Sequence, residues 1–278
     1  MKTGKPERNS RATHDDRESQ HHPSTDRVYG VMPVLEALRA GKRTIEHIAI
    51  ADGIRHERLS ELVELARTAR VPIRKVPRTE LERTLGALTH QGVVAKIAAA
   101  RYTDADDLLD DLAARVKNND PPLVLGLDGL EDPRNFGAVL RTAECAGVHG
   151  VFTTERRAVG LTETVAKAAA GALEYVPVAR VTNLTRLIEQ LKERNIWVVG
   201  TAGETAREYT AWDWTLPTAV ILGSEGAGLH RLVRERCDEL VRIPLLGRLE
   251  SLNVAVAGGV ILYEALRQRA AANANRKP

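Results

Sequence analysis

At 278 residues with 43% hydrophobic composition, the chain is long enough for one large domain or two ordinary ones. Its 40 basic and 37 acidic residues give a formal net charge of +3, a mixed surface that is compatible with nucleic-acid binding without requiring it. Two cysteines exclude a disulfide framework, and no apolar run reaches the ~20 residues of a membrane span, so we expect a cytoplasmic protein with no membrane partner.

Both ends of the chain are predicted to be flexible tails, at residues 1–27 and 271–278. The first tail mixes charged residues with serine, threonine and histidine and has almost nothing that could be buried. His14, His21 and His22 have no cysteine or acidic partners at metal-ligand spacing. No metal site is therefore predicted.

Residues 28–98 alternate short apolar strands with amphipathic helices, which is typical of a small α/β domain. Strands are predicted at Ile45–Ala51, Ile73–Val76 and Val93–Ile97, and helices at Val34–Leu38 and Leu59–Ala69. Residues 99–121 combine an acidic run with a leucine stripe and lead into Asn-Asn-Asp-Pro-Pro, which stops a helix. We expect this segment to be a linker between two domains.

Residues 122–270 are predicted to form a second α/β domain with a mostly parallel sheet. Nearly continuous apolar runs at Leu123–Leu127, Val151–Thr153, Ile196–Val199 and Ala219–Leu222 are separated by helices at Phe136–Ala146, Leu184–Arg194 and Val254–Arg269. Strands of this kind are covered by helices on both faces. Ligands bind such sheets where loops leave the carboxyl ends of the strands, so three of these loops are candidate sites.

The first loop follows Leu123–Leu127 and reads Asp-Gly-Leu-Glu-Asp-Pro-Arg-Asn before a helix. Asn135 and Arg141 lie six residues apart, outside the apolar stripe of that helix. Taken alone, Asn135 has an ordinary interpretation as a helix cap and Arg141 as a surface cation.

The second loop, at residues 223–228, has glycines spaced G-x-x-G-x-G. This is neither the G-x-G-x-x-G of dinucleotide sites nor the lysine-bearing phosphate loop, which disfavours a nicotinamide-dependent oxidoreductase and an ATP-binding protein. The third loop runs from Ile243-Pro244 to Ser251-Leu252-Asn253 and enters a helix of small and apolar residues. No histidine near Ser251 could activate it, so a serine hydrolase is disfavoured.

The order of the three loops is more specific than any one of them. Asn-x5-Arg after a strand, Leu-Gly-Ser-Glu-Gly-x-Gly, and Ile-Pro-x6-Ser-Leu-Asn closely resemble, in this order, the three motifs of the SpoU (TrmH) family of RNA ribose 2′-O-methyltransferases, within the SPOUT class. The resemblance extends from Val28 to Arg269. It looks closest to the branch that methylates a guanosine of 23S ribosomal RNA.

This resemblance implies an enzyme that uses S-adenosyl-L-methionine and whose second domain contains a deep trefoil knot. It implies that the first domain, similar to ribosomal proteins of the L30e type, binds 23S ribosomal RNA or a pre-ribosomal particle, and that the enzyme is a homodimer. The cofactor-binding positions carried over from the family are Thr201, Ala202, Gly203, Leu222, Gly223, Glu225, Gly226, Ile243, Pro244, Leu245, Ser251, Leu252 and Asn253.

The catalytic positions implied by the resemblance are Arg141, Asn135, Glu225, Ser251 and Asn253. Arg141 matches the catalytic arginine of the family. Because a guanidinium is a poor base, we expect Arg141 to bind a substrate phosphate and to orient or activate the ribose 2′-hydroxyl. The two asparagines and the serine supply neutral hydrogen bonds, and the glutamate orients Arg141 or a backbone amide.

Two other functions stay open. A relative that methylates transfer RNA or another ribosomal nucleotide would use the same chemistry, although minimal transfer-RNA members of the family lack the small N-terminal domain. A non-catalytic RNA-binding protein of the same fold is disfavoured, because the motif residues are intact.

Overall fold

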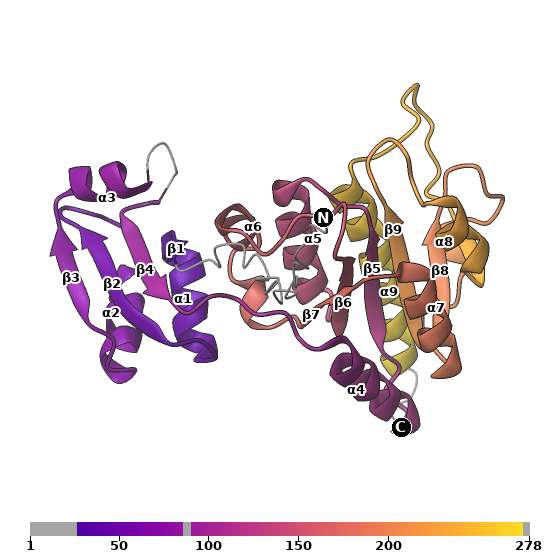
Figure 1. Ribbon diagram of the computed structural model, residues 1–278, viewed down its shortest axis with the longest axis horizontal. Coiled ribbons are helices and arrows are strands. Elements are labelled where there is room, and N and C mark those ends of the chain that lie inside the picture. Colours follow the sequence, from indigo (N-terminus) through magenta and orange to yellow (C-terminus); the bar gives the residue numbers. More distant parts are fainter. Residues whose placement is uncertain (1–26, 86–89, 275–278) are drawn as a thin grey trace, which may run out of the picture.

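The computed structural model describes residues 27–85 and 90–274, which form two α/β bodies that lie side by side (Figure 1). His14, His21 and His22, and nearly all of the predicted N-terminal tail, lie outside the described residues. The smaller body contains β1 (Arg27–Tyr29), α1 (Val31–Ala40), β2 (Ile45–Ala51), α2 (Leu59–Thr68), β3 (Ile73–Val76), α3 (Arg78–Leu85) and β4 (Val93–Ile97).

The four-stranded sheet of the smaller body has the order β1-β4-β2-β3. Only β2 and β3 pair in parallel, and the other pairs are antiparallel. The bounds of β2, β3 and β4 coincide with the predicted strands. Leu35 of α1, Ile48 of β2 and Leu62 of α2 are fully buried together in the core of this body. Two elements were not predicted: β1, which has three residues, and α3, whose charged sequence has no clear apolar stripe.

The segment predicted as a linker, residues 99–121, contains the helix α4 (Ala105–Lys117). Asp104 caps this helix by accepting hydrogen bonds from two backbone N–H groups of its first turn. Three leucines on one face of α4 are buried in the core of the larger body: Leu108, Leu109 and Leu112. The segment is therefore packed against the second sheet, because a leucine stripe is more stable when it is removed from water.

The larger body contains the remaining elements in chain order. They are β5 (Leu123–Asp128), α5 (Pro133–Cys145), β6 (Gly150–Thr154), α6 (Glu163–Ala168), η1 (Ala172–Glu174), β7 (Val178–Val181), α7 (Leu184–Glu193), β8 (Trp197–Thr201), η2 (Tyr209–Ala211), β9 (Thr218–Gly223), α8 (Arg231–Arg236), β10 (Glu239–Val241) and α9 (Val254–Ala274). Residues 271–274, which we placed in the C-terminal tail, continue α9.

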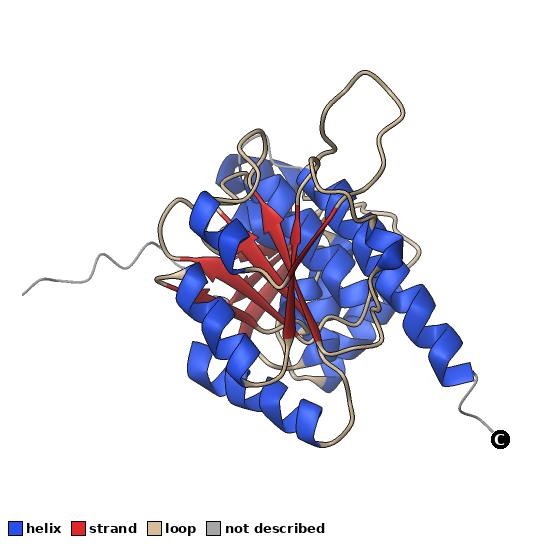
Figure 2. Ribbon diagram, turned by 90° about the vertical axis from the view of Figure 1, so that its right-hand side faces the viewer, coloured by secondary structure: helices blue, strands red, loops and turns tan. Residues whose placement is uncertain are grey.

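The six-stranded sheet of the larger body has the order β10-β8-β9-β5-β6-β7, and all of its strand pairs are parallel. Helices cover both faces of the strands (Figure 2). The predicted α/β class with a mostly parallel sheet is thereby confirmed. Residues 242–253 leave β10 as a long loop, gold in Figure 1, and then enter α9. The trefoil knot stays a prediction.

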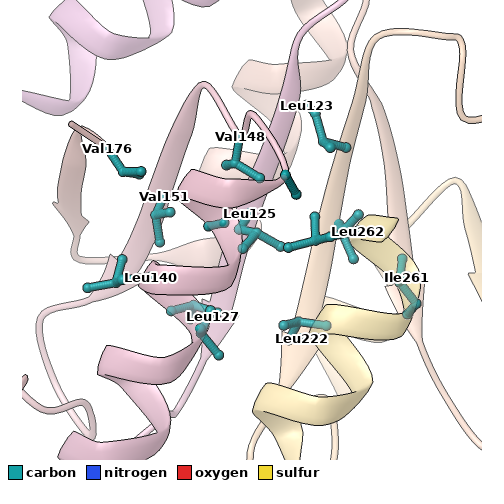
Figure 3. Close-up of a cluster of buried hydrophobic side chains, with 14 of the residues drawn as sticks. Leu123, Leu125, Leu127, Leu140, Val148, Val151, Val176, Leu222, Ile261 and Leu262 are labelled. Carbon is teal, nitrogen blue, oxygen red and sulfur yellow. The ribbon is translucent and has the colours of Figure 1, made fainter. Parts of the chain in front are cut away.

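One hydrophobic core of the larger body, separate from the one that holds the α4 leucines, lies between the sheet and the helices α5 and α9 (Figure 3). In this core, Leu125 and Leu127 of β5 lie between Leu140 of α5 and two residues of other elements, Leu222 of β9 and Leu262 of α9. All five side chains are almost completely buried. Burial of each such side chain contributes about 1.5–3 kcal/mol to folding. These contacts hold the ends of β5 and β9 at fixed positions beside α9.

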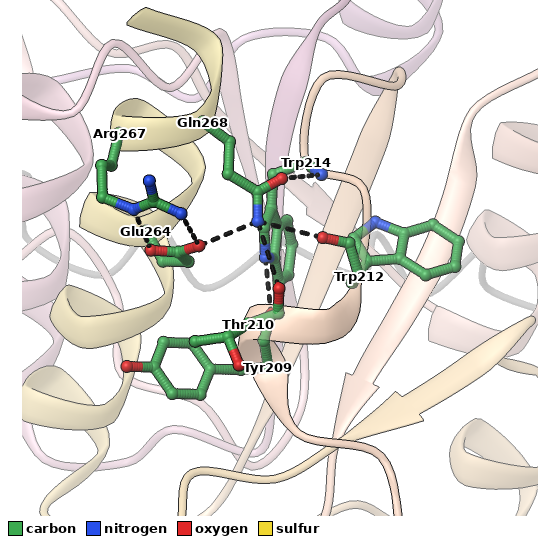
Figure 4. A network of polar contacts seen from close by, with 7 residues as sticks. All are labelled: Tyr209, Thr210, Trp212, Trp214, Glu264, Arg267 and Gln268. Atoms are coloured by element: carbon green, nitrogen blue, oxygen red, sulfur yellow. Dashed lines mark hydrogen bonds and ion pairs between the residues drawn. The ribbon is translucent and has the colours of Figure 1, made fainter. Parts of the chain in front are cut away.

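A polar network ties the loop after β8 to α9 (Figure 4). The Gln268 side chain accepts a hydrogen bond from the Trp214 N–H (2.9 Å) and donates to the carbonyl of Trp212 (3.1 Å). The same amide nitrogen also donates to Glu264 (2.8 Å), whose pKa is lowered chiefly by its hydrogen bonds from Arg267. The network fixes the far end of the loop that begins at Thr201.

The two bodies meet where β1 lies near α6, and where α1 and the residues after it lie near η1. Arg43 forms an ion pair with the buried carboxylate of Glu174, in which Nε donates to Oε2 at 3.1 Å. The Tyr175 hydroxyl donates to Glu36 Oε2 at 2.8 Å. Gly171 has φ 102°, and a Cβ there would lie 2.4 Å from the Cβ of Glu36. This close approach of the two bodies therefore requires glycine.

Candidate functional site

A cavity of about 320 Å³ lies at the carboxyl ends of β8, β9 and β10. Segments 201–204, 222–229 and 241–243 form its walls, together with Leu245 and residues 250–252 of the long loop. Three residues of α9 also line it, spaced three and four positions apart and so on one helix face: Val254, Ala257 and Ile261. Its volume lies within the ~300–1,000 Å³ that is usual for small-molecule sites.

The glycine-rich loop after β9 is a tight hairpin. The backbone N–H of Ser224 donates to the Gly228 carbonyl at 3.0 Å, and the N–H of Gly228 donates to the Ser224 carbonyl at 3.0 Å. Gly226 and Gly228 have φ of 85° and 68°, a region that favours glycine. A Cβ at Gly223 would lie 2.2 Å from the carbonyl carbon of Gly228. The glycine spacing of the motif thus follows from the geometry of the hairpin.

The structure brings together one residue from each of the three sequence motifs. Asn135 Nδ2 donates to Glu225 Oε1 at 2.6 Å. Asn253 Nδ2 donates to the same Oε1 at 2.8 Å and to Asn135 Oδ1 at 3.0 Å. The Asn253 Oδ1 also accepts from the backbone N–H groups of Ala255 and Val256, which caps α9. We call Asn135, Glu225 and Asn253 the amide–carboxylate cluster.

Arg141 lies on α5, six residues after Asn135, which corresponds to about 9 Å along the helix and about 120° around it. Its side chain is exposed and lines neither the cavity nor the amide–carboxylate cluster. In the part of the chain that the structure describes, no hydrogen bond or ion pair is formed by its guanidinium. Arg141 therefore lies apart from the cluster, on an exposed part of α5.

Most of the predicted cofactor positions line the cavity: Thr201, Ala202, Gly203, Leu222, Gly223, Glu225, Gly226, Ile243, Leu245, Ser251 and Leu252. Pro244 and Asn253 do not. Arg234 also lines the cavity, and its guanidinium forms an ion pair with Glu204. Arg234 was not predicted, because this contact joins residues that are 30 positions apart. Ala257 and Ile261 were not predicted either, although their helical spacing from Val254 could have indicated them.

The cavity lining fits S-adenosyl-L-methionine, the expected cofactor. Leu245, Leu252 and Ile261 supply apolar surface for a flat purine, while the loops supply many backbone groups for polar atoms. The buried Nε of Arg242, which also lines the cavity, has no acceptor among residues 27–85 and 90–274. A buried donor without a partner is costly, and a bound ligand with an acceptor would remove that cost.

A second cavity, of about 360 Å³, lies beside the first and shares Ser224 and Glu225 with it. Gly129, Leu130, Glu131, Asp132, Arg157 and His230 complete its lining. Asp128, at the end of β5, is buried and accepts two hydrogen bonds from His230, one from the backbone N–H (2.7 Å) and one from ring Nδ1 (2.9 Å). This interaction fixes the orientation of the imidazole ring.

Neither cysteine offers a reactive thiol. Burial raises the pKa of the Cys237 thiol to about 12. The pKa of Cys145, which is exposed on α5, is also raised, by desolvation first and by Glu144 second. Both are therefore protonated and poorly nucleophilic at neutral pH. The described residues contain no group of three potential metal ligands, and none of their helices is long and apolar enough to cross a membrane.

Comparison with known families assigns both bodies. Residues 122–263 match the SpoU rRNA Methylase family, and residues 27–103 match the model for RNA 2′-O ribose methyltransferase substrate binding. The chain is 45% identical over 253 residues to the 23S rRNA (guanosine-2′-O-)-methyltransferase RlmB of Pseudomonas syringae, covering 91% of this chain and 98% of that protein. It is 43% identical over 251 residues to YacO of Bacillus subtilis, named as a TrmH family tRNA/rRNA methyltransferase, covering 90% and 98%.

Solved structures agree with these matches. The SpoU methyltransferase AviRb of Streptomyces viridochromogenes, in complex with the cofactor AdoMet, has a TM-score of 0.71 and 27% sequence identity, covering 88% of this chain and 90% of that one. An AdoMet-bound rRNA methyltransferase of Sinorhizobium meliloti has a TM-score of 0.69 and 25% identity, covering 87% and 86%.

Fold, site and relatives together define an RNA ribose 2′-O-methyltransferase that uses S-adenosyl-L-methionine. More narrowly, the chain belongs to the SpoU rRNA methylase family, the TrmH family of rRNA and tRNA methyltransferases. The family, the enzyme class and the cofactor predicted from the three motifs are confirmed.

Proposed function

We propose that the protein methylates the ribose 2′-hydroxyl of a guanosine in 23S ribosomal RNA, either free or in a pre-ribosomal particle. The main support for methyltransferase activity is the amide–carboxylate cluster, which joins all three motifs at the edge of the cofactor cavity. The guanosine and the 23S RNA are supported by the 45% identity to the Pseudomonas syringae enzyme, which carries both in its name.

In this proposal, the smaller body binds the RNA substrate. Arg55, Arg74 and Lys75 are exposed on it, and within the described residues they form no hydrogen bond or ion pair with protein groups. Free cations of this kind bind phosphates without reading sequence. The division into a substrate-binding domain at 28–98 and a methyltransferase domain at 122–270, with α4 packed on the second, belongs to the same proposal.

The three loops of the first cavity hold the cofactor in this proposal, through Thr201–Gly203, Leu222–Gly226 and Ile243–Leu245, with Ser251 and Leu252 closing the site. When bound, the cofactor supplies an activated methyl group on a sulfonium. The protein has to align a weakly nucleophilic alcohol and help it lose a proton.

The amide–carboxylate cluster holds the ribose. Glu225 Oε1 accepts two amide hydrogen bonds, which fixes the carboxylate and leaves Oε2 to accept a hydrogen bond from the substrate. Asn135, Asn253 and Ser251 supply neutral hydrogen bonds around it. Arg141, about 9 Å further along α5, binds a phosphate next to the reacting ribose and thereby orients its 2′-hydroxyl.

We also propose that the enzyme is a cytoplasmic homodimer. Val256, Tyr263 and Leu266 form an exposed apolar stripe on α9, and the first two are each 52% exposed. Leu246 and Leu249 of the long loop add to this surface, because they are 100% and 81% exposed. Exposed apolar surface of this extent marks an interaction site, and a second copy of the chain can bury the same stripe symmetrically.

The function is tested by mapping 2′-O-methyl marks in RNA from cells with and without the protein, and by incubating unmodified 23S RNA with the purified enzyme and labelled S-adenosyl-L-methionine. A single guanosine mark that depends on the protein in both experiments is the expected result, with the Arg141→Ala variant as the inactive control. A mark on transfer RNA, or on a nucleotide other than guanosine, would overturn the proposal.

A further inference from the structure

The second cavity and the cofactor cavity share one short segment of their lining, Ser224-Glu225. Glu225 belongs to the amide–carboxylate cluster, which the proposed function assigns to the ribose. Loops that follow the adjacent strands β5 and β9 line the second cavity, at the carboxyl end of a parallel sheet. A nucleoside whose ribose lies at Glu225 is thus next to both the cofactor cavity and this cavity.

The charged side chains that line the second cavity differ in how many hydrogen bonds they already form with the protein. Asp132 Oδ1 accepts from two backbone N–H groups at the start of α5, and Glu225 Oε1 is held by the two asparagines. Glu131 and Arg157 are both exposed, and neither has a hydrogen bond or ion pair with another described residue. One carboxylate and one guanidinium therefore have all their hydrogen-bonding capacity left for a ligand.

His230 provides an ordered flat surface in the same cavity. Its Nδ1 is hydrogen-bonded to Asp128, and Asp128 is only 4% exposed, so the ring is held in one orientation. The ring Cε1 would lie 3.5 Å from a Cβ at Gly129, a residue with φ 75°. Because position 129 carries no side chain, the ring and the backbone beside it stay open to a planar group, and bases stack on histidine rings.

On the basis of the proposed function, we propose that this second cavity binds the base of the target nucleotide, and that Glu131 and Arg157 select guanine. Guanine presents N1–H and an exocyclic N2 amino group, two donors that match the free carboxylate of Glu131. Its other edge presents O6 and N7, the acceptor pair that arginine binds in a bidentate manner. Adenine has an acceptor at N1, which a carboxylate repels, and an amino group in place of O6.

The acidic residues of the cavity favour a base over a phosphate as its occupant. Three carboxylates line it, from Glu131, Asp132 and Glu225, against one arginine and one histidine. A phosphate there would meet a surplus of like charge, whereas the donor edge of guanine is attracted by it. Phosphate binding suits Arg141 better, since it lies on the exposed side of α5 with no acidic partner among the described residues.

The test uses the full-length enzyme and 23S RNA fragments in which the mapped target guanosine is replaced by inosine, which lacks the N2 amino group, or by 7-deazaguanosine, which lacks N7. Rates are measured at subsaturating RNA for the wild type, Glu131→Met and Arg157→Met. The neighbouring exposed residues Glu155 and Arg156 do not line the cavity, so Glu155→Met and Arg156→Met are matched controls.

The wild type should prefer guanosine to each analogue by about 5- to 150-fold, the range for one good polar contact to a base. Glu131→Met should lose more rate on guanosine than on inosine, because inosine keeps only the N1–H contact that the variant also removes. Arg157→Met should likewise lose more rate on guanosine than on 7-deazaguanosine, which keeps only the O6 contact. The controls should keep the wild-type preference.

Equal losses on guanosine and its analogue in either variant would overturn the assignment of that residue, since a phosphate contact or a folding defect weakens all substrates alike. Unchanged rates would overturn it as well. These outcomes leave the proposed function standing, because the wild type still methylates guanosine. A wild type that methylates a different nucleotide overturns both.

Discussion

The ion pair between Arg43 and Glu174 is expected to couple the two bodies of the enzyme, and its removal to destabilise the protein strongly. The side chains are only 12% and 3% exposed, and Arg43 Nη1 also donates to the carbonyl of Ala98 at 3.2 Å. Replacing Arg43 by methionine keeps the aliphatic part of the side chain but leaves the Glu174 carboxylate buried without its partner. Removal of one member of a buried pair costs about 3–5 kcal/mol of unfolding free energy.

The two single variants should differ. Arg43→Met should cost about 3 kcal/mol, because Glu174 is short and cannot reach water from its buried position. Glu174→Leu should cost less, about 1–2 kcal/mol, because the longer Arg43 side chain can extend its charged end to solvent. The double variant should be more stable than Arg43→Met alone, because it buries no unpaired charge.

Urea unfolding followed by circular dichroism and by tryptophan fluorescence measures these differences. All three tryptophans lie in the larger body, so fluorescence reports on that body and circular dichroism on both. Arg67→Met is the control, because its ion pair with Glu64 is 78% and 67% exposed and should contribute at most about 1 kcal/mol. Strictly additive single and double variants, or an Arg43→Met cost no larger than that of the control, would refute the reasoning.

Four further outcomes are expected. Arg141→Ala should fold and bind cofactor but lose about a hundredfold or more in single-turnover rate, and Arg141→Lys should restore RNA binding more than rate; wild-type rates for both would contradict its role. Gly223→Ala should abolish cofactor binding in calorimetry, because its Cβ would lie 2.2 Å from the backbone of Gly228, and unchanged affinity would count against the hairpin geometry. Tyr263→Glu should convert a dimer to a monomer in sedimentation velocity, whereas a wild-type monomer with full activity would remove the dimer proposal. Methylation should continue in the presence of a chelator when RNA folding is controlled, and activity that is lost and then restored by a divalent ion would show that the expectation of no metal is wrong.

Several features of this protein could be read from the sequence because they depend on neighbouring residues. The bounds of β2, β3 and β4 follow from short apolar runs, and α5 and α7 follow from apolar residues at three- and four-residue intervals. The motif glycines are also local, since Gly226 and Gly228 adopt positive φ within one hairpin. Elements with weak local patterns, such as the charged α3 and the short α8, were missed.

The prediction of the site depended on the order of the three motifs, because no local sequence pattern shows which distant side chains will be in contact. Asn135 and Asn253 are 118 residues apart, yet their amides are hydrogen-bonded at 3.0 Å. The resemblance to a family indicated both residues, but only the structure showed that Asn253 both caps α9 and joins Glu225, and that Arg141 lies apart from them. The same holds for Pro244, which matches the motif but does not line the cavity.

The tertiary structure alone decided how the two bodies meet and where the leucine stripe of α4 is buried. Arg43 and Glu174 are 131 residues apart, and in the sequence each is an ordinary surface-type charge. Periodicity likewise shows that α4 has an apolar face, but not which sheet covers it. Local sequence determines backbone conformation and the side of an element that avoids water, whereas the partner of that side is chosen by packing between distant parts of the chain, which no short window of sequence contains.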